Sequence, residues 1–142
     1  MSSHGLEALK QICTSIARET PAGYAWAWDE RFRTALLVFD AKDHERICAQ
    51  VIGRFMGKWD VTTIEKASAM VHDLVRSRLD IRPGQVVFAS DDGVHTLLYA
   101  AWWPWDDGSR ISLRVGMCAG RAGAVIDEKL EHFIREWFDI GG

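Results

Sequence analysis

The sequence lacks any run of about 18 apolar residues, roughly the minimum for a membrane-spanning helix. Residues 1–5 have neither the basic flank nor the apolar core of a secretory signal. The 3 cysteines are an odd number and widely spaced, which argues against a disulfide framework and for reduced thiols. These absences together predict a cytoplasmic protein without a membrane partner.

An excess of basic charge is also missing. The formal net charge is −3 and the pI is near 5.9, so a broad nucleic-acid surface is not expected, although a small basic patch is compatible with these values. The sequence has no nucleophile-elbow pattern and no phosphate loop with its lysine. His44 and Cys48 could share one side of a helix, but no third ligand follows at motif spacing. We therefore expect no metal, no cofactor and no catalytic set.

The chain does contain enough apolar sequence for a folded core. Its 142 residues are 48% hydrophobic and 26% charged, which is ordinary for a soluble globular protein. No repeat, linker or low-complexity tract divides the sequence. Residues 1–142 are therefore expected to form a single domain.

Three apolar runs predict three consecutive antiparallel strands, at residues 85–90, 94–103 and 109–118. Asp92-Gly93 marks the first turn, and residues 104–108 form the second. A two-residue first turn and a five-residue second turn give all three strands one shared apolar face. That face is expected to contain Val86, Phe88, Leu97, Tyr99, Ala101, Trp103, Ile111, Leu113, Val115 and Met117.

Apolar periodicity in the rest of the chain predicts the remaining elements. Helices are expected at 3–19, 43–56, 62–79 and 124–138, a hairpin at 24–28 and 32–39, and a short strand at 58–61. The expected fold class is α+β: a mainly antiparallel sheet of five or six strands packed with about four helices, in the order α-ββ-α-β-α-βββ-α. This order resembles the profilin-like folds, which include GAF and PAS sensor domains and the roadblock and longin interaction modules. The resemblance implies a shape and carries no functional residue.

Seven tryptophans are many for this length, and their positions relative to arginine are the main indication of function. In the expected registers, both hairpins place tryptophan beside arginine on one open face. These residues are Trp26, Trp28 and Arg33 in the first hairpin and Trp102, Arg110 and Arg114 in the second. Arginine stacks on indole, and both residue types are enriched at interface centres. This face is interpreted as an interface, as a ligand cleft, or as a helix-covered layer past which the arginines reach solvent.

Two smaller features leave alternatives open. Trp105, beside two carboxylates in its loop, could bind a cation or a partner, or fold back to close the end of the core. His95 with Asp91 or Asp92, near Ser90 across the hairpin, could form a polar cluster, although such groups usually serve turns.

The leading hypothesis is a small non-catalytic interaction or regulatory domain that self-associates through the face bearing tryptophan and arginine, or through an edge strand. The alternative is a small-molecule sensor of the GAF or PAS type, with an aromatic cleft for a planar or cationic ligand. An enzyme with an unrecognised site is the third hypothesis. Expected partners are another copy, another protein or a small molecule, and nucleic acid is not favoured. A pocket between sheet and helix would favour the sensor, and a flat aromatic patch the interaction module.

Overall fold

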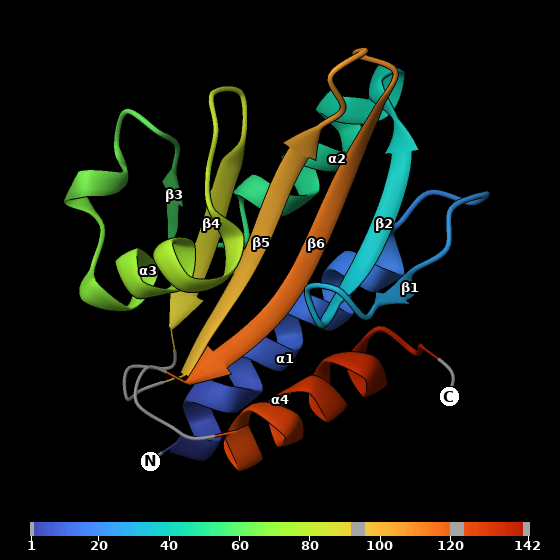
Figure 1. Ribbon diagram of the computed structural model, residues 1–142. Helices are drawn as coiled ribbons and strands as arrows, with labels where there is room; N and C mark the ends of the chain where they lie inside the picture. The colour runs from blue at the N-terminus through green and yellow to red at the C-terminus, as the bar shows by residue number, and fades with distance from the viewer. Residues whose placement is uncertain (1, 92–95, 120–123, 141–142) are drawn as a thin grey trace.

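A computed structural model describes residues 2–91, 96–119 and 124–140, which form a six-stranded antiparallel sheet with helices on both faces (Figure 1). The helices are α1 (Ser2–Glu19), α2 (His44–Ile52), α3 (Ala69–Leu74) and α4 (Ala124–Trp137), with the shorter turns η1 (Ala41–Asp43), η2 (Ile64–Lys66) and η3 (Val75–Leu79). The strands are β1 (Ala27–Asp29), β2 (Thr34–Asp40), β3 (Gly57–Trp59), β4 (Val86–Asp91), β5 (Thr96–Pro104) and β6 (Arg110–Ala119).

The predicted fold class is confirmed. Within the described residues the structure has four helices and a six-stranded antiparallel sheet, and the elements follow the expected order. The likeness to profilin-like and GAF-like folds stays a prediction. Among the described residues, no helix combines the length and the apolar character needed to cross a membrane.

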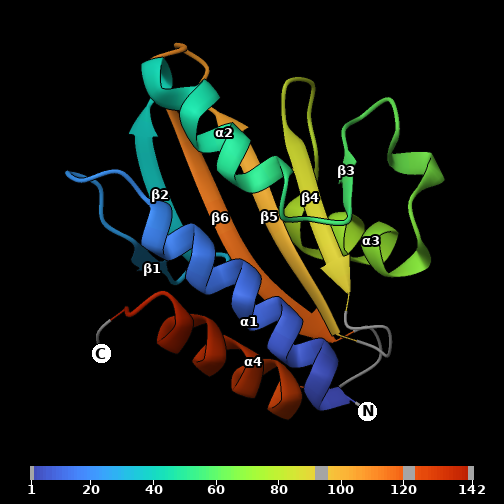
Figure 2. The same cartoon turned by 180° about the vertical axis from the view of Figure 1, so that it is seen from behind.

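The strands lie in the order β1-β2-β6-β5-β4-β3, so β6 joins the first hairpin to the later strands. Helices α1, α2 and α4 cover one face of this sheet (Figure 2), whereas α3 and η3 cover the other face only over β4 and β5 (Figure 1). The molecule therefore has one large apolar layer and one smaller one, and no described helix covers the rest of the sheet face that carries the smaller layer.

The larger core forms where α1 and α4 meet the centre of the sheet. Leu9, Cys13 and Ile16 follow helical spacing on α1 and are each at most 2% exposed. They pack in one cluster with strand residues that include Leu37 and Leu113. Burial raises the pKa of the Cys13 thiol, because a thiolate would lose its hydration there. Cys13 is therefore a neutral apolar core residue.

The smaller core forms between α3, η3 and the outer side of β4 and β5. Val71, Leu74 and Leu79 pack there against strand residues that include Tyr99. The helix expected from residue 62 begins only after Ser68, whose hydroxyl accepts from the Val71 backbone N–H at 3.4 Å. Residues 62 and 63, expected in the first turn of this helix, do not belong to it. Their backbone N–H groups donate to the Asp60 carboxylate.

The register of β5 corrects the expected one. Trp102 pairs with Val86 on one side and with Leu113 on the other, at the positions where Tyr99 was expected. β5 is thus displaced by three residues relative to both neighbours, and because three is odd, each of its side chains changes face. β4 and β6 keep the expected faces. The Asp92-Gly93 turn that set the expected register lies outside the described residues.

The displacement divides β5 between the two cores. Leu98, Ala100 and Trp102 join the larger core. Leu97, Tyr99 and Ala101 join the smaller one, and Trp103 packs at its border. Almost every residue of the strand is buried, so both of its faces are apolar. Hydrophobic alternation could therefore not identify which face belongs to the larger core.

Candidate functional site

Trp102 is not a surface residue, contrary to the sequence-based prediction. Its side chain is 7% exposed and its ring centroid lies 5.4 Å from that of Phe39 in the larger core. The cause is the displaced register of β5, which turns Trp102 toward the helices and Trp103 toward Arg114. A cluster of tryptophan and arginine does exist in the second hairpin, but Trp103 is its tryptophan.

The residues predicted from the first hairpin, Trp26, Trp28 and Arg33, do not contribute to that cluster. Trp28 pairs with Ala35 rather than with Arg33, and its ring lies 4.3 Å from the Arg135 guanidinium of α4. Trp26 lies on the same helix-covered side, where it donates from Nε1 to Thr20 Oγ1 at 2.9 Å. The prediction that Trp26 and Trp28 share one open face with the tryptophan and arginines of the second hairpin is therefore wrong.

Arg33 also faces α4. Its guanidinium donates to the Glu131 carboxylate in three hydrogen bonds of 2.6–2.9 Å, through Nε and Nη2. This contact raises the pKa of Arg33 further, because the carboxylate stabilises the charged form. Arg33 thus ties the β1–β2 turn to α4.

Arg114 is the centre of the cluster that the structure does form. Its guanidinium carbon lies 4.8 Å from the ring centroid of Phe32 and 4.8 Å from that of Trp103. Its Nε donates to Asp29 Oδ2 at 2.6 Å, and both side chains of this ion pair are at most 15% exposed. The two rings contact each other edge to face at 5.0 Å. Arg114 therefore joins β1, the β1–β2 turn, β5 and β6 at a single point.

Trp105 and Arg110 lie on the same side of the sheet as Arg114. Trp105 is 43% exposed, so the interpretation that it closes the end of the core is wrong. Its Nε1 donates to Ser112 Oγ at 2.9 Å, which holds the indole over the outer side of β6. The Arg110 guanidinium lies 5.9 Å from the same ring. These two predicted residues therefore remain at the surface.

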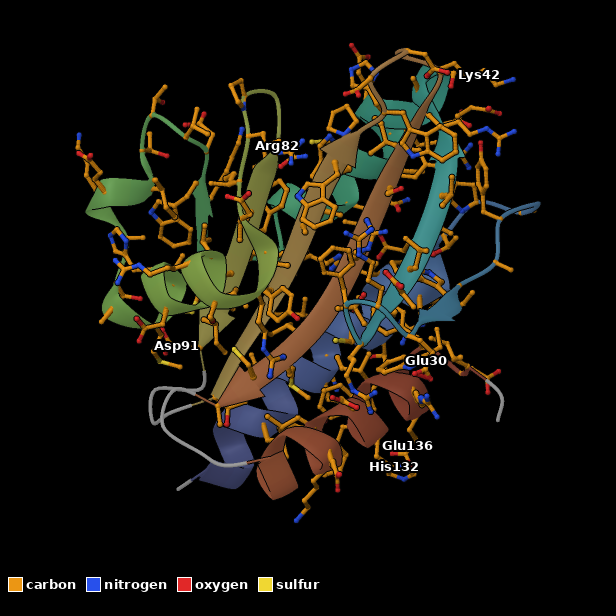
Figure 3. All side chains as sticks on the ribbon, viewed as in Figure 1. Glu30, Lys42, Arg82, Asp91, His132 and Glu136 are labelled. Carbon is orange, nitrogen blue, oxygen red and sulfur yellow. The ribbon has the colours of Figure 1, made fainter. Side chains whose placement is uncertain are left out.

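A cleft of about 420 Å³ lies beside Arg114, between the sheet, η3 and the β1–β2 turn. We call it the arginine cleft, and it is lined by Arg31, Phe32, Arg78, Leu79, Asp80, Arg82, Gln85, Trp103 and Arg114. Among the described residues of this lining, all four basic ones are arginines and the only carboxylate is Asp80. In Figure 3, Arg82 lies near the start of β4 and the end of β5.

The arginines of the cleft differ in their surroundings. Arg114 is held by Asp29, whereas Arg31, Arg78 and Arg82 are exposed at the rim. Burial is the main cause that raises the pKa of the Tyr99 hydroxyl, and the nearby Arg78 acts in the opposite direction. Arg31 and Arg82 form no ion pair with a carboxylate in the part of the chain that the structure describes.

The backbone beside the cleft departs from regular geometry. Val75–Leu79 form a π-helical turn, and Asp80 follows with φ 54° and ψ 145°, a conformation that residues with a Cβ rarely adopt. Such strain costs about 1–3 kcal/mol and is concentrated at functional sites. In this chain it brings Arg78 and Arg82 to the same rim as Arg31.

Guanidinium groups bind carboxylates and phosphates through paired N–H donors in a fixed plane. Three exposed guanidinium groups around a concave surface therefore suit an anionic ligand. The described lining contains no histidine, cysteine, serine or lysine that could act as a nucleophile or base. Among the residues the structure covers, no three His, Cys, Asp or Glu side chains lie close enough to hold a metal ion.

The polar cluster proposed around His95 falls partly outside the structure, because His95 and Asp92 are not among the described residues. The Ser90 hydroxyl accepts from the Met56 backbone N–H at 2.8 Å and is 3% exposed. Ser90 therefore links β4 to the segment before β3.

The chain matches no protein-family model, no curated protein and no solved structure.

Sequence reasoning missed Arg31, Phe32, Arg78 and Arg82 as site residues. One local signal was present: arginine occurs at positions 76, 78 and 82, and the last of the three immediately precedes Pro83. No local sequence pattern links these arginines to Arg31 or Trp103. The three segments are distant in the chain and come together only in the folded sheet.

Proposed function

We propose that the protein is a non-catalytic binding domain that takes an anionic ligand in the arginine cleft. The observation that carries this proposal is the lining itself, with four arginines, one aspartate and two aromatic rings around about 420 Å³. That volume lies in the range of small-molecule and side-chain binding pockets. Arginine without lysine favours planar recognition of carboxylate or phosphate over general attraction of charge.

This proposal keeps the non-catalytic domain of the leading hypothesis and the ligand cleft of the alternative. The composition of the cleft argues against self-association through the same face. A twofold dimer contacts itself with identical patches, so the patch that holds Arg31, Arg78 and Arg82 would face a second patch of the same charge. Both sheet edges are strands of only three residues, β1 and β3, which offer little backbone for edge pairing.

The test is a titration with inorganic pyrophosphate at low ionic strength, followed by calorimetry and by tryptophan fluorescence. We expect the wild type to bind and Arg82→Glu to weaken binding at least about tenfold, because an attractive charge becomes a repulsive one. Arg82 is exposed, so this change leaves the fold intact.

Arg46→Glu is the matched control, because Arg46 is an exposed arginine on α2 and lies on the other face of the sheet. It makes the same change in net charge far from the cleft. Equal affinity of the two variants, or no binding by the wild type, would contradict the proposed function.

A further inference from the structure

The described helices cover only part of the sheet face that carries the arginine cleft. In Figure 1, α3 and η3 lie over β4 and β5, and no described helix lies over the same side of β6 and β2. Figure 2 shows that the reverse side of these two strands is covered by helices. The uncovered side begins where the cleft ends, at Trp103 and Arg114.

The uncovered side has a mixed apolar and basic surface. Leu36 and Val38 of β2 are partly exposed on it, next to Arg114 and Ser112 of β6. Beyond them lie the exposed ring of Trp105 and the Arg110 guanidinium. We call Leu36, Val38, Trp105 and Arg110 the open sheet face; Ser112, which accepts from Trp105, is only 7% exposed.

The open sheet face and the cleft form one continuous surface. Ser112 pairs with Trp103 on one side and with Val38 on the other, so it joins the two sets of residues. Arg110 and Arg114 are four residues apart on β6, which is about 13 Å along a strand. A small anion in the cleft cannot reach Trp105 and Arg110 as well. An extended chain of about five residues spans the whole surface.

The chemistry of this surface selects the occupant. Guanidinium groups at both ends favour carboxylates, and the aliphatic and indole groups between them favour apolar side chains. Three carboxylates near the surface are already engaged. Asp29 accepts from Arg114, and Asp40, which pairs with Arg110, accepts from the Tyr24 hydroxyl. Asp107 accepts from Ser109, which together with Arg110 lowers the Asp107 pKa. A second copy would oppose arginine to arginine.

We propose that the occupant is an acidic, extended segment of a partner protein. It lies across the open sheet face and places one carboxylate in the arginine cleft. This inference rests on the proposed function and specifies its ligand. The rim arginines supply charge recognition, and Trp105 supplies an exposed aromatic anchor of the kind that dominates interface energetics.

The test is fluorescence anisotropy with a labelled peptide of roughly twelve residues in which glutamate and valine alternate, a length that exceeds the surface. We expect this peptide to bind more tightly than pyrophosphate. Trp105→Ala should weaken the peptide about fivefold and leave pyrophosphate binding unchanged, whereas Arg82→Glu should weaken both. A peptide with glutamine in place of glutamate should not bind.

The outcomes separate this inference from the proposed function. If pyrophosphate binds but the peptide binds no more tightly, or if Trp105→Ala leaves peptide binding unchanged, the acidic segment is the wrong occupant and the cleft remains an anion site. A single-stranded oligonucleotide that binds more tightly than the peptide would also overturn it. If neither pyrophosphate nor the peptide binds, the proposed function itself fails. Arg110→Glu provides a second variant that should weaken the peptide alone.

Discussion

Arg114→Met is expected to lower the free energy of unfolding by about 3–5 kcal/mol, because it leaves the Asp29 carboxylate nearly buried without its partner. Methionine keeps much of the side-chain volume but cannot donate to Asp29. It also removes the guanidinium from between Phe32 and Trp103, so the wall of the cleft loses its support. Urea denaturation of the variant and the wild type measures the difference.

Arg110→Met is the matched control for stability. Arg110 lies on the same strand and the same side of the sheet, but it is exposed. We expect its replacement to change stability by no more than about 0.5 kcal/mol. The double variant Asp29→Asn with Arg114→Met should recover part of the loss, because no uncompensated carboxylate remains. Equal losses for the two methionine variants would show that the Asp29–Arg114 pair does not hold this region together.

Gly116→Ala is expected to cost about 2–3 kcal/mol through overpacking. A Cβ at this position would lie 2.6 Å from the Tyr99 hydroxyl oxygen and 2.9 Å from Thr34 Cγ2. Tyr99 is 1% exposed and Thr34 is fully buried, so neither side chain has space to move. Thermal and urea denaturation measure the loss. Because Arg78 of the cleft lies near the Tyr99 hydroxyl, weaker pyrophosphate binding should accompany the loss of stability.

Gly53→Ala controls for the intrinsic effect of replacing glycine. A Cβ added at Gly53 would lie 3.9 Å from the Ala49 carbonyl oxygen, which is ordinary contact. The backbone of Gly53 is already helical. Alanine there should be neutral or stabilise by up to about 1 kcal/mol, because it restricts the unfolded chain. A Gly116→Ala variant as stable as the wild type would mean that Tyr99 does not occupy the position described.

The fold class was predictable because most elements carry a local pattern of their own. α1 shows helical spacing of buried residues, and β6 alternates buried apolar positions with Arg110, Ser112 and Arg114. β5 carries no such pattern, since both of its faces are buried. Its register depended on an assumed turn length, and an error of three residues exchanged Trp102 for Trp103 as the partner of Arg114.

The candidate site was only partly predictable, for a different reason. Arg114, Arg110 and Trp105 were identified because they are near neighbours on one hairpin. Arg31 and Arg82 reach the same cleft through the pairing of β2 with β6 and through the chain reversal at Asp80. That reversal uses a positive φ at a residue other than glycine, which composition does not indicate. Tertiary structure therefore created the cleft from residues that have no shared sequence signal.

The central claim is that anions bind on the side of the sheet carrying Trp103 and Arg114. The most direct measurement is the two-dimensional ¹H–¹⁵N NMR spectrum of the protein during titration with the glutamate–valine peptide. We expect the indole N–H signals of Trp103 and Trp105 and the Nε–H signal of Arg82 to shift, while those of Trp102 and Trp137, buried in the larger core, stay in place. Shifts confined to residues of α1, α2 and α4, or no shifts at all, would contradict this account.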